Sequence, residues 1–291
     1  MTEGGNVMMG AMWRRILVVV ALGFGFGAAR AQDNGGQISF AFAAQAGSGI
    51  YDVEGRIIQI YRIPISFPVK SLTEERRWGV SVRTPVTFGF YDYNAADALV
   101  GNFPSHIGAA SLLPGVRFDV RAKDNWIVSP YADFGAAKDF SGGSLAWVYD
   151  VGMESVVSFP VGSWAARAGQ EVLWAGAAQT ADPLNDWYGE AKAGFEFRHE
   201  LGFSMGKSRA DIGLFGVYYR YFKHERESTA VTYAAPAPAT VPGVNEQTEI
   251  GLSFGSRPKL AWWKLSMPKL GVSYRFGDGI GTVRIIFGEI F

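Results

Sequence analysis

Hydrophobic and polar residues alternate along most of this chain with a period of two, the repeat of a β-strand whose faces meet different surroundings. Between Glu190 and Arg198 most even positions are charged and every odd position is alanine or phenylalanine. Turn-rich breaks divide the chain from Gln37 onward into about twelve such segments. Their approximate spans are 37–48, 55–69, 77–92, 107–122, 126–139, 144–159, 163–177, 187–199, 210–223, 246–256, 267–277 and 280–291.

The links between these segments alternate in length, as in bacterial barrels with long outer loops and short inner turns. Tight inner turns are predicted at Lys123–Asn125 and Pro160–Gly162, and outer links include 94–106, 178–186 and the Ala/Pro-rich 224–245. Two predicted inner links, 200–209 and 256–266, are longer than this rule expects. If both chain ends lie on the inner side, odd-numbered links face outward, and the alternation in length then supports the strand count.

Two folds explain alternating strands, a soluble sandwich and a membrane barrel. Composition favours the barrel, because 48% of residues are hydrophobic and 14% aromatic, whereas only 19% are charged; an ordinary soluble domain carries roughly 25% charged residues. Aromatic residues also gather near segment ends, as in an interfacial girdle: Tyr91, Tyr93, Trp126, Trp147, Trp164, Trp187, Tyr221 and Phe222. The predicted fold class is all-β, a transmembrane up-and-down antiparallel β-barrel of about twelve strands.

The first residues have the features of a secretory signal peptide. Arg14 and Arg15 precede an apolar run from Ile16 to Phe26, and Ala29-Arg30-Ala31 has small residues at both outer positions of a cleavage site. We therefore expect residues 1–31 to be removed and residues 32–291 to form one barrel domain, with a long outer loop at 224–245. No later run is long enough for a membrane-spanning helix.

The stretch from Ile280 to Phe291 places Val283, Ile285, Phe287 and Phe291 on one face, interrupted by Glu289. A final strand ending on an aromatic residue resembles the C-terminal signature of bacterial outer-membrane barrels. The resemblance implies that Phe287 and Phe291 form an assembly signal, with the barrel assembly machinery and periplasmic chaperones as partners.

Several further stretches resemble the solitary, passenger-less autotransporter-type barrels of the bacterial outer membrane. They are Gly47–Tyr51, Arg56–Ile65, Pro85–Tyr93, Leu113–Val116 and the hairpin sequence Lys138–Gly143. The resemblance implies twelve strands, which agrees with the count from periodicity. Autotransporter barrels also carry a passenger and a helix through the pore, and the residues from Gln32 to Gly36 leave room for neither.

Strand parity predicts a charged lumen. A charge inside a membrane barrel has to be paired or hydrated, so these residues either pair across the lumen and close it or line a narrow water-filled channel. The near balance of signs favours pairing. The predicted inward residues are Arg62, Arg83, Arg117, Asp119, Arg121, Asp133, Asp150, Glu154, Arg167, Glu171, Glu190, Lys192, Glu196, Arg198, Arg220, Glu249, Arg275 and Arg284.

The residues present offer little support for a catalytic site or a metal site. The His-x-Ser pair of outer-membrane phospholipases does not occur, and the chain has three histidines and no cysteine. A protease-like rim could use Asp92, Asp97, His106 and Asp139, but acids in outer loops are usually solvated. We expect no catalytic residues, no cofactor and no metal, so that alanine at these four positions leaves any outer-membrane phenotype unchanged; a lost activity would place the protein among hydrolases.

The sequence therefore predicts an integral barrel of a Gram-negative outer membrane, in contact with its lipid and lipopolysaccharide. A structural or translocator-like role is favoured, a narrow channel for small charged solutes is the alternative, and an outer-membrane hydrolase ranks last. The formal net charge of zero argues against a nucleic-acid partner.

Overall fold

The computed structural model describes residues 44–45, 47–53, 56–93, 108–140, 145–179, 185–205, 208–223, 245–257, 261–262, 265–266, 269–277 and 280–291. The predicted signal peptide, the loop at 224–245 up to residue 244, and the first part of the segment predicted as strand 37–48 lie outside these residues. No helix within the described ranges has the length and apolar character needed to cross a membrane.

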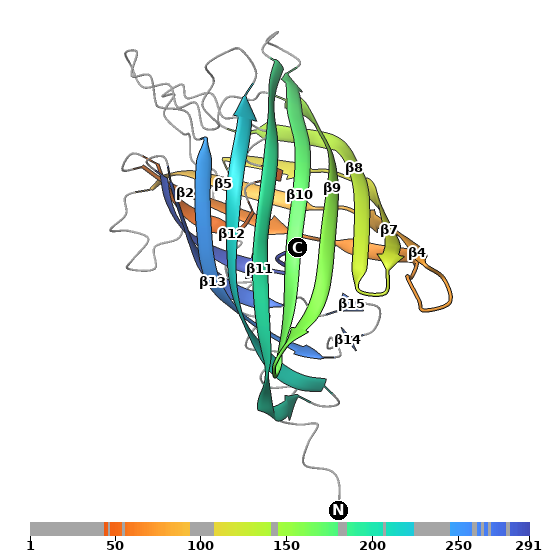
Figure 1. The fold of residues 1–291 in the computed structure, drawn as a ribbon. Coiled ribbons are helices and arrows are strands. Elements are labelled where there is room, and N and C mark those ends of the chain that lie inside the picture. Colours follow the sequence, from red (N-terminus) through yellow and green to blue (C-terminus); the bar gives the residue numbers. More distant parts are fainter. Residues whose placement is uncertain are drawn as a thin grey trace, which may run out of the picture.

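Twelve antiparallel strands close into a barrel in which each strand pairs with the next and the last pairs with the first (Figure 1). This confirms the fold class and the strand count from the sequence. The strands are β1 (Gly49–Val53), β2 with β3 (Arg56–Ile63, Ser66–Lys70), β4 with β5 (Trp78–Arg83, Val86–Tyr93), β6 with β7 (Ala109–Leu112, Gly115–Lys123), β8 (Trp126–Asp139), β9 (Leu145–Val161), β10 (Trp164–Gln179), β11 (Asn185–Met205), β12 (Ser208–Lys223), β13 (Glu246–Arg257), β16 (Leu270–Gly277) and β17 (Ile280–Phe287).

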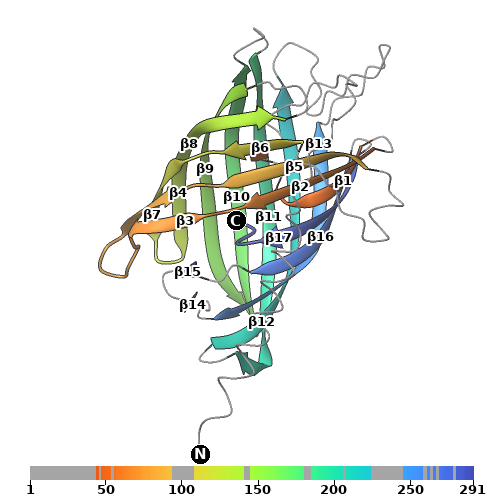
Figure 2. The ribbon, with the colours of Figure 1, turned by 180° about the vertical axis from the view of Figure 1, so that it is seen from behind.

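Three neighbouring strands are interrupted by proline, which removes a ladder donor from a sheet. Pro64 separates β2 from β3, Pro85 lies between β4 and β5, and Pro114 lies between β6 and β7. The strand register places these breaks side by side, because Ile63 faces Val86 and Arg83 faces Gly115. The wall bends along this line, and Figure 2 shows β3, β4 and β7 splayed from the rest of the barrel.

Two inner links differ from the sequence prediction. β11 continues to Met205 and β12 begins at Ser208, so the long link predicted at 200–209 is replaced by strand with a register shift after Glu200. The link predicted at 256–266 contains a small separate hairpin of β14 (Ala261–Trp262) and β15 (Leu265–Ser266).

The first strand is shorter than predicted and starts later. Ala44 and Gln45 have helical backbone conformation, and β1 begins only at Gly49. Gln45 Nε2 donates a hydrogen bond of 2.5 Å to Asp150 on β9, across the barrel from β1. The prediction of a strand over 37–48 is therefore wrong for the described residues 44–45 and 47–48, because the chain there enters the lumen instead of extending the wall.

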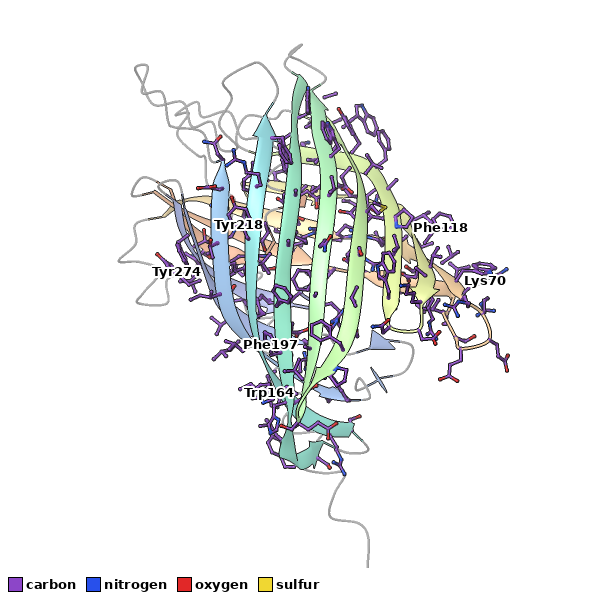
Figure 3. All side chains as sticks on the ribbon, viewed as in Figure 1. Lys70, Phe118, Trp164, Phe197, Tyr218 and Tyr274 are labelled. Atoms are coloured by element: carbon purple, nitrogen blue, oxygen red, sulfur yellow. The ribbon has the colours of Figure 1, made fainter. Side chains whose placement is uncertain are left out.

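Apolar side chains face outward and polar ones face inward, the reverse of a soluble domain. On β9, Trp147, Val151 and Met153 are exposed, whereas Asp150 and Glu154 are buried. Phe118 and Tyr274 project from the outer wall in the same way (Figure 3). A continuous exposed apolar surface with charges inside suits a barrel surrounded by lipid.

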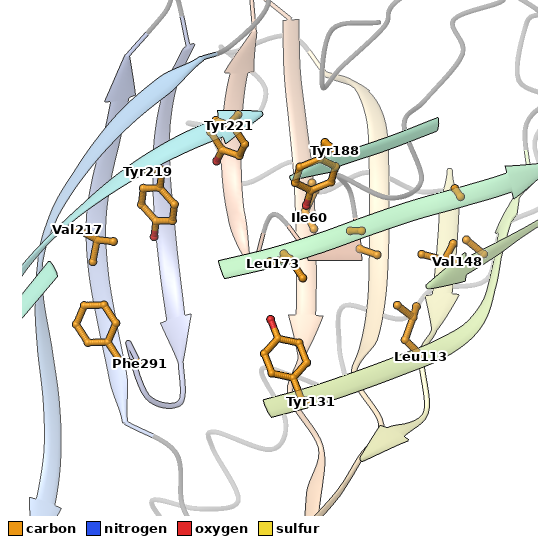
Figure 4. Close-up of a cluster of buried hydrophobic side chains, with 14 of the residues drawn as sticks. Ile60, Leu113, Tyr131, Val148, Leu173, Tyr188, Val217, Tyr219, Tyr221 and Phe291 are labelled. Atoms are coloured by element: carbon orange, nitrogen blue, oxygen red, sulfur yellow. The ribbon is translucent and has the colours of Figure 1, made fainter. Parts of the chain in front are cut away.

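The lumen also holds an aromatic and aliphatic cluster (Figure 4). Tyr131, Tyr188 and Tyr219 point inward and are buried, together with small side chains such as Ala175. Tyr221, predicted for the interfacial girdle, belongs to this cluster, while its neighbour Phe222 is exposed on the outer face. Side chains thus fill much of the interior.

Glycine allows one of these rings to lie flat on the wall. Gly152 and Tyr131 are direct partners on β9 and β8, and a Cβ at Gly152 would overlap the Tyr131 ring. We predict that Gly152→Val lowers the free energy of unfolding by about 1–3 kcal/mol, the usual cost of overpacking. Urea unfolding in lipid vesicles, followed by tryptophan fluorescence, measures this change.

Gly202→Val is the matched control, because nothing lies within 4 Å of a Cβ at that position. Equal unfolding midpoints for Gly152→Val and Gly202→Val would contradict the packing that we describe for Tyr131.

Candidate functional site

The lumen concentrates the charged groups of the protein and is the candidate functional site. Except for Arg220, the residues predicted to line it lie on the inner faces of their strands. Most of them form ion pairs with one another, in three groups, the first of which lies nearest the short-turn end of the barrel, the lower end in Figure 1.

The first group, the Glu196 cluster, consists of Glu196, Arg167, Arg198, Asp211, Lys269 and Glu289. Glu196 has no exposed surface, and three cations surround it. Arg198 approaches within 2.9 Å, Lys269 within 3.2 Å and Arg167 within 3.3 Å.

Asp211 holds the far side of the Arg198 guanidinium, whose Nε donates to it over 3.0 Å. The six members of the cluster carry three charges of each sign, so the group is neutral as a whole.

The second group lies further toward the long loops. Glu249 pairs with Arg284 and also accepts hydrogen bonds from Tyr219 (2.6 Å) and Ser273 (2.5 Å). Both of its carboxylate oxygens therefore have partners, one cation and two hydroxyl groups. On the neighbouring strands, Glu171 pairs with Lys192 and accepts the Tyr131 hydroxyl.

The third group lines the wall formed by β4, β7, β8 and β9. Arg117 pairs with Glu154 at 2.7 Å and with Asp119 at 2.8 Å, and Asp119 also accepts the Ser129 hydroxyl. Close by, Arg83 pairs with Asp133 at 3.0 Å. The Arg83 guanidinium also stacks over the Tyr131 ring at 4.2 Å.

Three lumenal arginines form no direct ion pair. Within the part of the chain that the structure describes, Arg62, Arg121 and Arg275 have no carboxylate within salt-bridge distance. Arg275 is buried, stacks on the Tyr219 ring at 3.8 Å and donates to the Tyr221 hydroxyl. These three cations provide the specific support for a lumen that interacts with anions.

Arg220 corrects the parity prediction, because it lies on the outer face. Its neighbours Tyr219 and Tyr221 are buried inside, and Arg220 itself is half exposed and pairs with Glu246 at 3.1 Å. The error arose because the inner face of β12 is largely apolar and aromatic. Period two separates two faces of a strand without identifying which one is inside.

The sequence missed three members of the Glu196 cluster. Asp211 has the same parity as the inward residues Phe215 and Tyr219, so a correct orientation of β12 would have found it. Lys269 precedes the first residue of β16. The alternation pattern puts Glu289 on the lipid-facing side of the last strand, where a carboxylate is energetically unfavourable. This unfavourable placement is the signal in the sequence that Glu289 lies elsewhere.

The two residues predicted as the assembly signal lie in different settings. Phe287 ends β17, and Phe291 is buried in the lumen, away from the outer face that carries Val283 and Ile285. The chain turns inward at Gly288, which has a positive φ of 116°. The structure thus separates Phe291 from the face predicted for it, and the role of both residues in assembly stays a prediction.

The structure describes two of the four residues considered for a protease-like rim. Asp92 and Asp139 are at the ends of β5 and β8, and residues 97 and 106 lie outside the described ranges. Within the described ranges, no group of three or more histidine, cysteine or acidic residues is placed to hold a metal ion.

The fold has counterparts among solved structures. The β domain of the Bordetella autotransporter BrkA matches with a TM-score of 0.51 and 11% sequence identity, over 82% of this chain and 93% of that chain. LpxR from Salmonella typhimurium matches with a TM-score of 0.45 and 12% identity, over 82% of this chain and 90% of that chain. No family model matches the sequence, and no curated protein is similar to it.

The first similarity confirms, at the level of the fold, the resemblance to autotransporter-type barrels seen in the sequence. The protein is accordingly a twelve-stranded barrel with the architecture of an autotransporter β domain. At this identity the likeness concerns architecture and carries no information on individual side chains.

The burial of Glu196 makes it a sensitive position. Glu196→Gln removes the charge that faces three cations, and a buried ion pair that loses one partner typically costs about 3–5 kcal/mol. We predict a loss of that size in the free energy of unfolding, measured by urea unfolding in vesicles. Glu200→Gln, which breaks an exposed pair with Arg209, should leave the midpoint unchanged within error. Equal effects of the two substitutions would show that Glu196 is hydrated in the folded barrel.

Proposed function

We propose that the protein is an integral outer-membrane barrel of a Gram-negative bacterium with a structural or translocator-like role, and that its lumen is closed in the resting state. The observation that carries this proposal is the mutual compensation of the lumenal charges. Glu196, Glu249 and Glu171 each have a cationic partner within the lumen. Charges that pair with one another leave little need for bulk water between them.

Chain segments inside the barrel support the same conclusion. Gln45 contacts Asp150 from the segment before β1, and Phe291 is buried in the lumen after β17. With the inward tyrosines, these segments occupy space that a channel would need for water. The end of the chain lies within the ring of strands in both views of the molecule (Figures 1 and 2).

The outer surface supports a membrane location. Exposed apolar side chains cover the barrel wall, and lipid and lipopolysaccharide are the partners that fit such a surface. The barrel assembly machinery and periplasmic chaperones remain the partners expected from the sequence resemblance. A role as a hydrolase is not supported by a constellation of described side chains, and we rank it last.

A narrow channel for small charged solutes is the second candidate. Its support comes from Arg62, Arg121 and Arg275, the lumenal cations described above that form no direct ion pair. A guanidinium without a direct ion pair inside a barrel is stabilised by water or by a passing anion. Such a channel would prefer anions.

Electrical recording separates the two candidates. We predict that refolded residues 32–291 in a planar bilayer show no steady conductance, with heat-modifiable mobility on a gel as proof of folding. Steady, anion-selective openings of the folded protein would reject the closed barrel in favour of the channel. Arg275→Met should then reduce the anion selectivity.

A further inference from the structure

The last residues of the sequence leave the wall through a glycine hinge. The Gly288 amide still donates to the carbonyl of Lys269 over 2.9 Å, continuing the ladder between β16 and β17. Its positive φ of 116° then turns the chain, a conformation that side chains other than glycine rarely adopt. Beyond this hinge, residues 289–291 run into the lumen.

Two cations hold the carboxylate that follows the hinge. Glu289 lies 2.5 Å from Lys269 Nζ and 2.6 Å from Arg167 Nη1. The other terminal nitrogen of Arg167 donates to the carbonyl oxygen of Phe291 over 3.2 Å. One guanidinium therefore binds both the side chain and the backbone of this segment.

The Phe291 ring rests on a part of the wall that has no side chains. Gly169 on β10 and Gly194 on β11 are direct cross-strand partners, and a Cβ on either residue would overlap the ring. Val217, the partner of Gly194 on β12, is buried beside it, and Figure 4 shows Phe291 below Val217. Only glycine at both positions leaves room for an aromatic ring this close to the backbone.

We propose that Arg167, Lys269, Gly169 and Gly194 form a binding site inside the barrel for a Glu-x-Phe segment, and that residues 288–291 are a displaceable plug that occupies it. This inference rests on the proposed closed lumen and assigns the closure at the short-turn end to these four residues. Arg167 and Lys269 recognise the acid, and the glycine pair recognises the ring.

The contacts suit a segment that can leave. Glu289 and Arg167 are 28% and 20% exposed, so water competes for their ion pair, whereas Glu196 beneath them is fully buried. When the segment leaves, Arg167 and Lys269 keep Glu196 as a partner. The cluster then retains three cations against Glu196 and Asp211, and this positive excess favours rebinding of an acidic segment.

The test compares three refolded full-length proteins in a planar bilayer: the parent, the double variant Glu289→Gln/Phe291→Ala, and Ile285→Ala. Ile285 lies on β17, shortly before the plug, but faces outward, so its substitution is the control. We expect the parent and the control to be silent and the double variant to show openings. The peptide Gly-Glu-Ile-Phe, added at the short-turn side, should close them, and Gly-Gln-Ile-Ala should not.

The outcomes distinguish the two proposals. A folded double variant as silent as the parent would overturn the plug and leave the closed barrel standing. Steady conductance of the parent would overturn the closed barrel itself. Openings that the acidic aromatic peptide does not close would reject the binding site.

A labelling experiment covers the case in which the double variant does not fold. The chain has no cysteine, so Ile290→Cys provides a single thiol within the plug. Adding Glu289→Gln should raise its rate of reaction with a water-soluble maleimide about tenfold, because the neutral amide keeps a hydrogen bond but loses the charge that Arg167 and Lys269 bind. An unchanged rate would show that the segment is not held by Glu289.

Discussion

The structure depends on the requirement that a charge enclosed by a lipid-facing wall be compensated from within. Glu196 shows this most directly, since it has no exposed surface and meets cations from β10, from β11 and from Lys269, just before β16. Because strands distant in sequence supply the partners, the ion pairs connect the barrel across its interior as the backbone ladder connects it around its circumference. Glu249, with Arg284 and two hydroxyl groups, repeats this arrangement nearer the long loops.

On its outer face the wall has the opposite requirement, that apolar side chains contact lipid. Exposed Phe118, Val151 and Tyr274 would be unfavourable in water but are suited to hydrocarbon. The three aligned prolines bend one side of this wall, and the segments carrying Gln45 and Phe291 turn into the space it encloses. Closure of the lumen thus combines charge pairing, aromatic packing and inserted chain, each visible as a separate set of contacts.

Period-two alternation predicted much of this architecture, because a long strand between lipid and lumen shows its two faces in the sequence. The segment 126–139 coincides with β8. The prediction failed where the chain leaves the wall, at residues 44–45 and 47–48 and at Phe291, since alternation continues in sequence even when the backbone turns inward. It also failed at Arg220, where an aromatic inner face reversed the expected orientation. Which charges meet across the lumen depends on strand register and stagger, and these appear only in the folded barrel.

A double-mutant cycle between Glu249 and Arg284 tests mutual compensation most directly. The free energy of unfolding in vesicles would be measured for the parent, Glu249→Gln, Arg284→Met and the double variant. Internal pairing predicts that the double variant is more stable than the sum of the single losses implies, with a coupling of about 1–3 kcal/mol. Additive losses would mean that water neutralises each charge separately, and would contradict a lumen closed by its own ion pairs.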